Sequence, residues 1–456
     1  MPASRLSLVC SAARRALNNS AKPGTHIYWR VSRICRHCLQ TNCELFYGGR
    51  MKRNVLLLPV LLVPMFWGCG DLLTEAPEPN QVLDGPIDGL SPAQNAAHLA
   101  GDAGFSERFS PATGLGPVFN QTSCESCHPG DGRGHPATNL KRFGKMTAAG
   151  FDYLHERGGP QLQDRAIPGY PAEKLPAEAT GISERGGPIV VGLGLIEAIP
   201  DEAILANEDP NDADGNGISG RANFVLPPPY LRLRADKIER NGKYLGRFGR
   251  KATAIDLLQQ TVTAYLNDIG VTSEFEPEEL FNPELGNRVG DNVPDPEVAT
   301  ETINNVVIYL QTLRPPERRN ATDAVVLQGE QLFAQIGCAS CHTPEMQTGP
   351  NAIAPLAFQK VPLYSDLLLH DMGSALADNY PEGEANGAEW RTTPLWGLGL
   401  VGELLGGTPF YLHDGRTSSL QEAILLHGGE AEVSRNNFAG LNAGEKAAVL
   451  AFLKSL

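Results

Sequence analysis

The sequence Cys-Glu-Ser-Cys-His at residues 124–128 returns, with one change, as Cys-Ala-Ser-Cys-His at residues 338–342. Two cysteines separated by two residues and followed at once by histidine form the attachment pattern of c-type haem: the thiols add to the haem vinyl groups and the histidine ligates the iron. The chain is therefore predicted to carry two covalent haems. The residues expected to hold them are Cys124, Cys127 and His128 for haem 1 and Cys338, Cys341 and His342 for haem 2.

Two other interpretations of these motifs stay open at this point. A zinc site can use Cys-x-x-Cys, but it needs a second thiol pair or a His-x₃₋₅-His sequence nearby, and neither motif has one. A structural disulfide within each motif is the other alternative. Four of the nine cysteines precede Met51 and one is Cys69, so only the motif cysteines remain and no disulfide framework is expected.

The segment 51–69 has the pattern of a lipoprotein-type signal peptide. The basic pair Lys52-Arg53 precedes an apolar run at residues 55–67, which is too short to span a bilayer, and Cys69 follows a small residue. We predict a lipid anchor on Cys69 and a location in the periplasm of a Gram-negative bacterium. Ordinary cleavage that leaves Cys69 as a free thiol is the alternative.

The segments on either side of this signal are expected to have different roles. An arginine-rich arm over residues 1–50 fits no role upstream of a signal, so we expect it not to be translated or not to belong to the mature protein. Residues 70–92 contain the acidic, proline-bearing sequence Thr-Glu-Ala-Pro-Glu-Pro-Asn at 74–80, which indicates a tether.

The formal charge of −14 bears on the choice of partners. Residues 1–68 hold ten Lys and Arg but only one acidic residue, Glu44, so the mature chain is more acidic still. Such a surface disfavours nucleic acid and anionic lipid headgroups, and membrane contact is expected through the lipid anchor only. The same charge could steer a basic electron donor, or it could serve solubility alone.

An internal duplication organises the remainder of the chain. Gly-Leu-Gly-Leu occurs at 192–195 and again at 397–400, and Gly-Arg precedes a helical stretch both at 255–266 and at 420–426. Each half ends in an amphipathic helix, at 306–313 and at 449–456, and the proline pair at 315 and 316 marks the boundary. With 35 prolines, 49 glycines and few runs of alternating apolar residues, we expect helices joined by long loops and little sheet. Together with the two haem motifs this predicts a mainly α fold of two cytochrome c-like domains, 93–318 and 319–456, with a loop-rich insertion in the first.

Four further motifs carry a resemblance to a known family. They are Gly-Leu-Ile-Glu-Ala-Ile at 194–199, Asp-Gly-Asn-Gly-Ile-Ser-Gly-Arg at 214–221, Leu-Leu-Leu-His-Asp-Met-Gly at 367–373 and Leu-His-Asp-Gly-Arg at 412–416. From about residue 90 to the end, the chain resembles the di-haem oxidoreductase family, also described as thiol oxidoreductase-like, which is related to the bacterial di-haem cytochrome c peroxidases. The resemblance implies a peroxidase-like oxidoreductase and often a homodimer.

The resemblance also suggests the sixth ligand of haem 2. In the di-haem peroxidases the distal methionine lies fourteen residues past the histidine of a His-Asp-Gly turn. In this chain that histidine is His413 and the ligand position is His427, so we predict His342 and His427 as the axial pair. Met372 is the rival ligand, and thioether ligation would raise the haem potential.

Haem 1 lacks an equivalent histidine, because the matching position in the first half is Thr261. That asymmetry makes haem 1 the candidate reactive site. A loop histidine could still close it, as in the resting peroxidases, and His135 is the first candidate, with His155 as the second. A solvated loop histidine is the alternative for both.

Peroxide cleavage needs a group that moves a proton between the two oxygens, and a carboxylate can do so. The peroxidases place a glutamine and then a glutamate on the helix after their first Gly-Arg turn. On the corresponding helix here we predict Asp268 as the acid/base and Gln260 as its orienting partner. The peroxidases also have a tryptophan between the haems, where this chain has Phe248, so Trp390 or Trp396 could substitute.

A calcium site is the last prediction. Asp212, Asp214 and Asn216 supply alternating oxygen ligands around a turn glycine, but position twelve is Asn223 rather than the bidentate glutamate of an EF-hand. The peroxidases bind calcium between their domains. An Asp/Asn-Gly turn without metal is the alternative.

Together these features predict a relay in which electrons pass from haem 2 to haem 1. The donor would be a small redox protein or a quinol-linked carrier, and the substrate a peroxide or another oxidant or reductant. The alternative is an electron carrier that performs no catalysis and has both irons capped.

Overall fold

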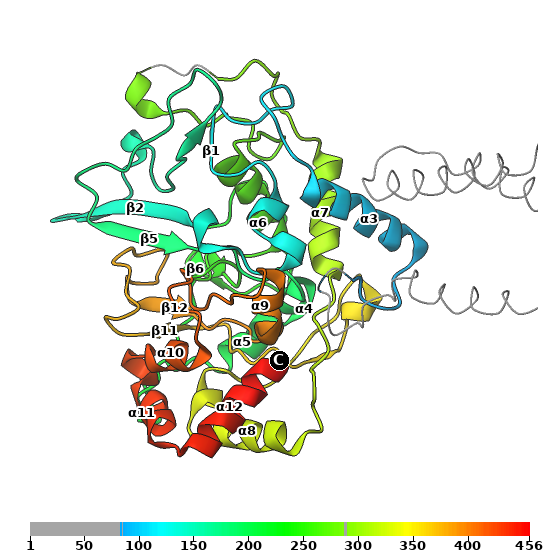
Figure 1. Cartoon of the computed structure of the whole chain (residues 1–456). Helices are drawn as coiled ribbons and strands as arrows, with labels where there is room; N and C mark the ends of the chain where they lie inside the picture. Colours follow the sequence, from blue (N-terminus) through cyan, green and yellow to red (C-terminus); the bar gives the residue numbers. More distant parts are fainter. Residues whose placement is uncertain (1–82, 84, 287–289) are drawn as a thin grey trace, which may run out of the picture. The chain divides into compact units, whose positions relative to one another are not determined.

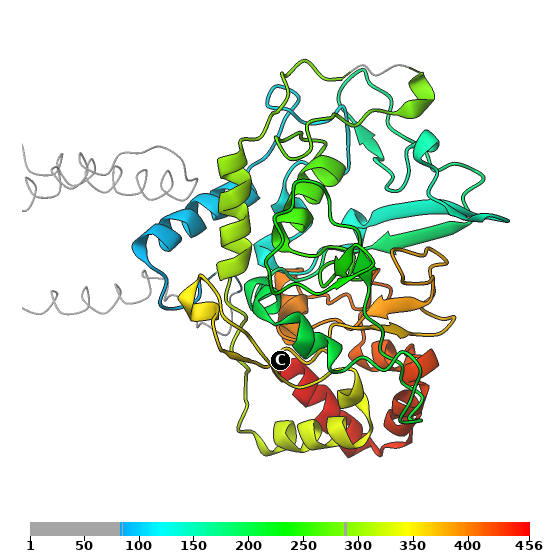
Figure 2. The same cartoon turned by 180° about the vertical axis from the view of Figure 1, so that it is seen from behind.

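Ten α-helices and twelve short strands, joined by long loops, make up the part of the chain that the structure describes, residues 83, 85–286 and 290–456 (Figures 1 and 2). In this computed structural model 33% of the described residues are helical, 3₁₀ and π turns included, and 13% are in strands or bridges. The prediction of a mainly α fold built from two cytochrome c-like domains is therefore wrong. The physical reason is that connections rich in glycine and proline pair with one another as strands of two to eight residues.

The helices and strands have the following bounds. The helices are α3 (Pro92–Ser106), α4 (Leu193–Ala198), α5 (Asp201–Leu205), α6 (Leu257–Ala264), α7 (Thr300–Thr312), α8 (Ala324–Gln335), α9 (Val401–Leu404), α10 (Leu420–Leu425), α11 (Glu432–Gly440) and α12 (Ala443–Ser455). The strands are β1 (Val118–Phe119), β2 (Leu140–Thr147), β3 (Gly150–Asp152), β4 (Arg165–Ala166), β5 (Gly181–Arg185), β6 (Phe224–Val225), β7 (Glu239–Arg240), β8 (Lys243–Leu245), β9 (Met346–Gln347), β10 (Lys360–Val361), β11 (Leu369–Asp371) and β12 (Glu389–Arg391).

Two helix pairs repeat the same packing. Helix α3 crosses α7, and helix α8 crosses α12, as Figure 1 shows at the right and at the bottom of the fold. A Cβ on Gly101 would lie 2.0 Å from the carbonyl oxygen of Asn305, and one on Gly329 would lie 1.9 Å from that of Ala448. Only glycine permits the backbones to approach this closely. The amphipathic helices predicted at the end of each half are confirmed, with longer bounds.

All sheets are small and antiparallel. Strand β2 lies between β3 and β5 in one three-stranded sheet, and β8 lies between β6 and β7 in another. The two-stranded sheets are β1 with β4, β9 with β10, and β11 with β12. Strand β5 alternates buried and exposed residues, with Arg185 at its buried end, so one face of this sheet points into the fold.

One hydrophobic core contains residues from both halves of the chain. It joins Phe105 and Leu257 of the first half to Leu368, Trp396 and Leu400 of the second, and the described residues belong to one compact unit. The predicted boundary at residue 318 falls in the connection between α7 and α8.

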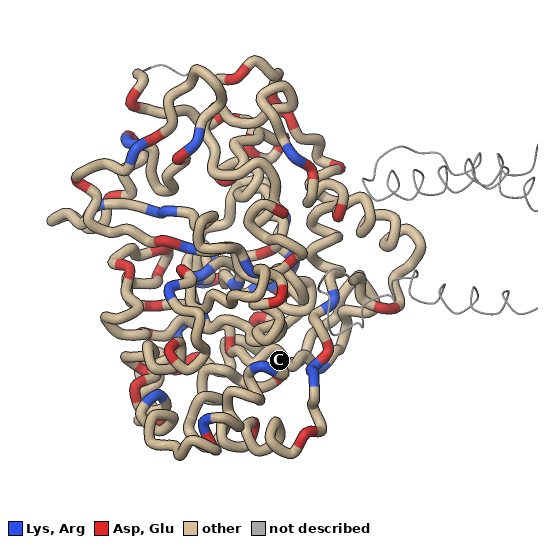
Figure 3. Tube along the Cα trace, viewed as in Figure 1, with Lys and Arg blue, Asp and Glu red and all other residues tan. Residues whose placement is uncertain are grey.

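In Figure 3 acidic and basic residues are both distributed over the described chain.

Several predictions lie outside the described residues. They concern residues 1–50, the signal peptide at 51–69, the lipid anchor on Cys69 and most of the tether at 70–92. Among the residues that the structure does describe, every helix is too short or too polar to cross a bilayer.

Candidate haem cavity

Both Cys-x-x-Cys-His motifs line one cavity of about 660 Å³. Each motif begins with a short 3₁₀ turn, Cys124–Ser126 in the first half and Cys338–Ser340 in the second, which turns the histidine back toward the cysteines. All four motif sulfurs are free, so the disulfide alternative does not apply to the described chain. Burial raises the pKa of Cys124 and of Cys338 to about 12, as for thiols in an apolar cavity wall.

The two motif histidines are oriented in the same way. Nδ1 of His128 lies 2.7 Å from the carbonyl oxygen of Pro188, and Nδ1 of His342 lies 2.9 Å from that of Tyr364. Burial lowers the pKa of both imidazoles to about 4, so both are neutral and donate through Nδ1. A neutral imidazole anchored at Nδ1 presents Nε2 to a metal, which is the usual arrangement of a haem ligand.

The helix pairs support these histidines with equivalent aromatic rings. The Phe105 ring centroid lies 6.1 Å from that of His128, and the Phe333 centroid lies 6.1 Å from that of His342. Each phenylalanine comes four residues after the glycine that lets its helix pair close. The close helix crossing therefore places the same ring against the predicted iron ligand in both halves.

His427 lines the cavity on the side of the second motif. Helix α10, capped by Ser419, ends just before it, and its Nδ1 lies 2.7 Å from the carbonyl oxygen of Ala423. Burial lowers the pKa of His427, and the proximity of His427 helps to lower that of His342. The two imidazoles are thus close, neutral and anchored at Nδ1. Met372 lines the same cavity, so the structure places both predicted candidates for the sixth ligand there.

A hydrogen bond between His370 of strand β11 and Glu430 holds the segment after His427 against that strand. The two ring nitrogens of His370 lie 2.8 Å from carboxylate oxygens of Asp366 and Glu430. Burial alone would lower the pKa of His370, but these carboxylates and Cys341 raise it to about 12, so the ring is a cation that donates to both. Glu430 also accepts from the hydroxyl and amide of Ser219.

Asp268 lines the cavity on the side of the first motif. Helix α6 continues into a π-helical turn, Tyr265–Ile269, and such turns often occur at functional sites. Burial raises the pKa of Asp268 to about 6, in opposition to a hydrogen bond from Gln161 and the charge of Arg142. The hydrogen bond that its Oδ1 accepts comes from Nε2 of Gln161, at 2.7 Å, and not from Gln260.

The other residues predicted for haem 1 divide between the cavity and the surface. Gln260 and Thr261 line the cavity, and the buried hydroxyl of Thr261 has no hydrogen-bond partner. His135 and His155 are exposed and do not line it. Nδ1 of His135 accepts from the amide of Ala137, so in this conformation neither loop histidine caps haem 1.

Arginine side chains form much of the polar wall, and sequence reasoning missed them. They come from segments far apart in the sequence, and the only available signal was the Gly-Arg pair at 249–250. Burial and the charges of Arg133 and Arg391 lower the pKa of Arg250. Within the described part of the chain, its guanidinium donates only to the carbonyl of Gly186. The six arginines that line the cavity are Arg133, Arg142, Arg185, Arg250, Arg391 and Arg435.

The positive charge on this wall exceeds the negative charge. Asp268, Glu382 and Glu430 are the carboxylates of the lining, and Glu430 is engaged by His370. Nε of Arg133 and Nε of Arg142 are buried without a hydrogen-bond partner. Buried arginines with unused donors fit an anionic ligand, and a haem carries two propionates. The residues of the cavity therefore fit haem in three respects: thiols, anchored imidazoles and spare guanidinium donors.

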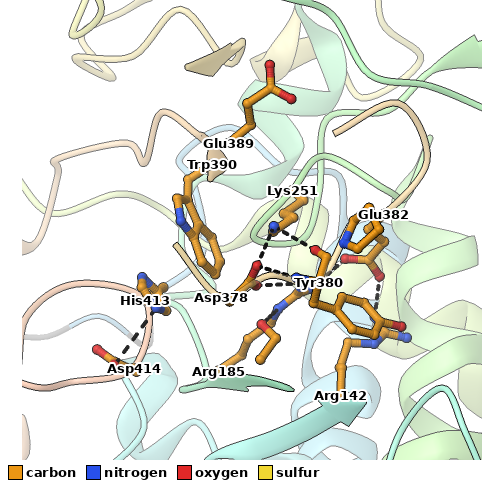
Figure 4. Close-up of polar contacts among 12 residues, drawn as sticks. Arg142, Arg185, Lys251, Asp378, Tyr380, Glu382, Glu389, Trp390, His413 and Asp414 are labelled. Atoms are coloured by element: carbon orange, nitrogen blue, oxygen red, sulfur yellow. Dashed lines mark hydrogen bonds and ion pairs between the residues drawn. The ribbon is translucent and has the colours of Figure 1, made fainter. Parts of the chain in front are cut away.

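Figure 4 shows the ion-pair network beside this wall. Glu382 accepts from Arg142 and from Arg185 at 2.6 Å each, and Lys251 donates to Asp378 at 2.9 Å. Lys251 also lies over the Trp390 ring, 4.6 Å from its centroid. The network joins strands β2 and β5 of the first half to the loop around residue 380 of the second.

The aromatic side chains named in the sequence analysis all line the cavity. They are Phe248, Trp390 and Trp396. Trp390 stacks on His413 with centroids 3.8 Å apart and an interplanar angle of 14°. Burial and nearby cations, Arg416 first, lower the pKa of His413 to about 2, so this ring is neutral.

The predicted calcium loop is an exposed, internally bonded turn. Carboxylate oxygens of Asp209, Asp212 and Asp214 lie within 4.8 Å of one another. The side-chain amide of Asn216 donates to Asp214 at 2.8 Å, and the amide of Gly217 donates to Asp212 at 3.0 Å. Calcium binding stays a prediction.

A single cavity with two haem-attachment motifs, two anchored histidines and a cationic wall defines a class of protein, the di-haem redox proteins. Comparison with known families gives the particular group. Residues 75–146 and 173–456 match the family described as "Di-haem oxidoreductase, putative peroxidase". The chain belongs to the di-haem oxidoreductase family, as its motifs predicted.

No curated protein matches the chain. Among solved structures, hydrazine synthase of Kuenenia stuttgartiensis matches with 14% sequence identity, over 90% of this chain and 100% of that one, with a TM-score of 0.33. A likeness at this level carries no argument about fold or function.

Proposed function

We propose that this protein is a periplasmic c-type di-haem oxidoreductase that reduces a peroxide at the His128 site with electrons received at the His342 site. The observation that carries the proposal is the asymmetry of the cavity. Near the second motif the wall holds a second anchored imidazole, His427, whereas near the first it holds a carboxylate, Asp268, and the small side chain of Thr261. The second site therefore resembles an electron-transfer site, and the first resembles a site at which a substrate could react.

The chain's own residues define how haem would be held. Cys124, Cys127 and His128 would hold one haem, and the equivalent residues of the second motif would hold the other, with His427 as the second imidazole. Haem bound in this way supplies storage and transfer of electrons and, where a coordination position is open, a place for peroxide. Met372 is the alternative to His427.

Asp268 would handle the proton. Reduction of hydrogen peroxide to two water molecules consumes two electrons and two protons, and one proton has to move from the bound oxygen to the departing one. With a pKa raised to about 6 by burial, Asp268 is mostly ionised at neutral pH but protonates readily. Gln161 engages Oδ1, which leaves Oδ2 to accept the proton and return it.

The remaining parts of the proposal concern location and partners. We infer a lipid anchor on Cys69, and an electron donor that is a small redox protein or a quinol-linked carrier. The Asp212 loop takes no part in the proposed reaction, because none of its carboxylates lines the cavity. Calcium bound there would stabilise the structure of the loop.

The experiment starts from a chain expressed from Met51 with haem-maturation machinery. Mass spectrometry should give two covalent haems, and electron paramagnetic resonance is recorded before and after half-reduction and after addition of peroxide. We expect a low-spin signal from the haem at the His342 site. The haem at the His128 site should give a high-spin signal, or one that becomes high-spin on half-reduction, and peroxide should change it. Asp268→Asn should lower peroxide turnover by about 10²-fold or more, whereas Asp102→Asn, at an exposed carboxylate on α3 outside the cavity, should leave it unchanged.

The rival proposal is an electron carrier without catalysis. Two low-spin signals that ignore peroxide in both redox states would support it and reject the peroxidase. Equal turnover in Asp268→Asn and the wild type would reject the acid/base role of Asp268 but not the peroxidase activity.

A further inference from the structure

The segment 147–172 lies between the two stretches of the chain that match the family. It forms β3, makes a 3₁₀ turn at His155–Arg157 and then returns alongside β2. The amide of Phe143 donates to the carbonyl of Pro160 at 3.0 Å, and the amide of Leu162 donates to that of Lys141 at 2.9 Å. This return places Gln161 directly opposite Arg142 on β2.

Gln161 reaches from this segment into the haem cavity. Its side chain is 5% exposed and lines the cavity beside Asp268. Nε2 of Gln161 donates to Oδ1 of Asp268 at 2.7 Å, to the carbonyl of Asn267 at 3.0 Å and to the side-chain oxygen of Asn120 at 3.1 Å. Asn120 in turn donates to the carbonyl of Leu162 at 2.8 Å. These contacts hold the amide in one orientation.

We propose that the segment 147–172, although outside the family match, is part of the reactive site, and that Gln161 is a positioning residue that holds the Asp268 carboxylate ionised and aimed into the cavity. The inference deepens the proposed function and rests on it for the role of Asp268. Gln161 is assigned as a positioning residue because it acts through Asp268 and not on the substrate.

The physical reason is the preference of a hydrogen-bond donor for the charged carboxylate. Burial raises the pKa of Asp268, whereas the Gln161 amide and the Arg142 guanidinium lower it. The other ionisable groups near this carboxylate are the sulfurs of Cys124 and Cys127, which haem attachment makes neutral. Without the Gln161 donor, burial would be opposed by Arg142 alone, so the pKa of Asp268 would rise further and the carboxyl would stay protonated to higher pH.

The same segment offers a matched control in Gln163. It is 4% exposed, comes two residues later and donates to the same Asn267 carbonyl at 3.1 Å. It does not line the cavity and makes no hydrogen bond to the Asp268 carboxylate. A change that acts only by loosening the segment should therefore appear in both glutamine variants.

The experiment titrates the Asp268 carboxyl in the full haem-loaded chain by difference infrared spectroscopy from about pH 4 to about pH 9. The carboxylic acid band is assigned by its loss in Asp268→Asn. In Gln161→Leu we expect the apparent pKa to rise by about one pH unit, and in Gln163→Leu we expect no change. Gln161→Glu keeps the shape of the side chain but replaces the donor with a second acid, and should raise the value further.

An unchanged Asp268 titration in both Gln161 variants would overturn the inference, as would equal shifts in Gln161→Leu and Gln163→Leu. Peroxide turnover is measured on the same samples and tests the proposed function separately. A shifted titration in a protein that ignores peroxide would keep the positioning role and reject the peroxidase. Peroxide turnover with an unshifted titration would keep the peroxidase and reject the positioning role of Gln161.

Discussion

Replacement of Glu382 by glutamine should destabilise the haem-loaded protein at neutral pH. The carboxylate accepts from Arg142 on one oxygen and from Arg185 on the other, at 2.6 Å each, and its side chain is 12% exposed. Burial alone would raise the pKa of Glu382, but the two arginines lower it from 4.5 to about 2. A shift of that size corresponds to about 3 kcal/mol of stability, similar to the cost of breaking a buried ion pair.

The pH dependence gives this prediction its sign. Because the pKa of Glu382 is lower in the folded chain than in the unfolded one, its contribution is complete above about pH 4.5 and is lost as the pH falls toward 2. The difference between the wild type and Glu382→Gln should therefore be largest at neutral pH and should shrink toward about pH 3. The glutamine variant lacks this contribution at every pH, because an amide is neutral and does not titrate.

Urea unfolding followed by circular dichroism at several pH values measures the loss of unfolding free energy in the variant and its dependence on pH. Glu384→Gln is the matched control, because Glu384 lies in the same loop and pairs with Lys243, with side chains 44% and 36% exposed. An exposed pair contributes about 0.2–1 kcal/mol. The reasoning fails if Glu382→Gln costs no more than Glu384→Gln at neutral pH, or if its effect grows as the pH falls.

Two further changes test the cavity and the helix crossings. His427→Met should keep the second haem low-spin and raise its reduction potential in a spectroelectrochemical titration; an unchanged potential would argue that Met372 is already the ligand. Gly329→Ala should lower stability by about 1–3 kcal/mol in thermal unfolding, because the new Cβ would lie 1.9 Å from the carbonyl of Ala448. Gly440→Ala, where nothing lies within 4 Å, should change stability by less than about 0.5 kcal/mol, and a similar loss in both would disprove the packing argument.

Local sequence patterns predicted the parts of the molecule that depend on local structure. The helical stretches expected at 255–266 and 420–426 are present as α6 with its π turn and as α10. Counting along the duplicated halves paired His427 with Thr261, because each comes at the same distance after the arginine of a Gly-Arg turn, and both line the cavity, Thr261 within α6 and His427 just after α10. The binding roles of these residues stay predictions.

The parts that sequence reasoning missed depend on contacts between distant segments. Gln161 and Asp268 are 107 residues apart, and no spacing rule connects them. The two arginines that donate to Glu382, Arg142 and Arg185, come from strands β2 and β5 in the other half of the chain. The strands themselves were missed because most have only two or three residues, too few for an alternating pattern to be visible.

The shared cationic wall has a consequence for the assembly of the protein in the cell. Both attachment motifs open onto the same cavity, and the pKa of Arg250 is already lowered by burial and by neighbouring arginines. A chain that has received only one cofactor would keep part of this buried positive charge without a counter-ion. We therefore expect half-loaded chains to be poorly folded and short-lived, so that biogenesis would favour chains with both cofactors or none, and the occupancy of one motif would be coupled to that of the other.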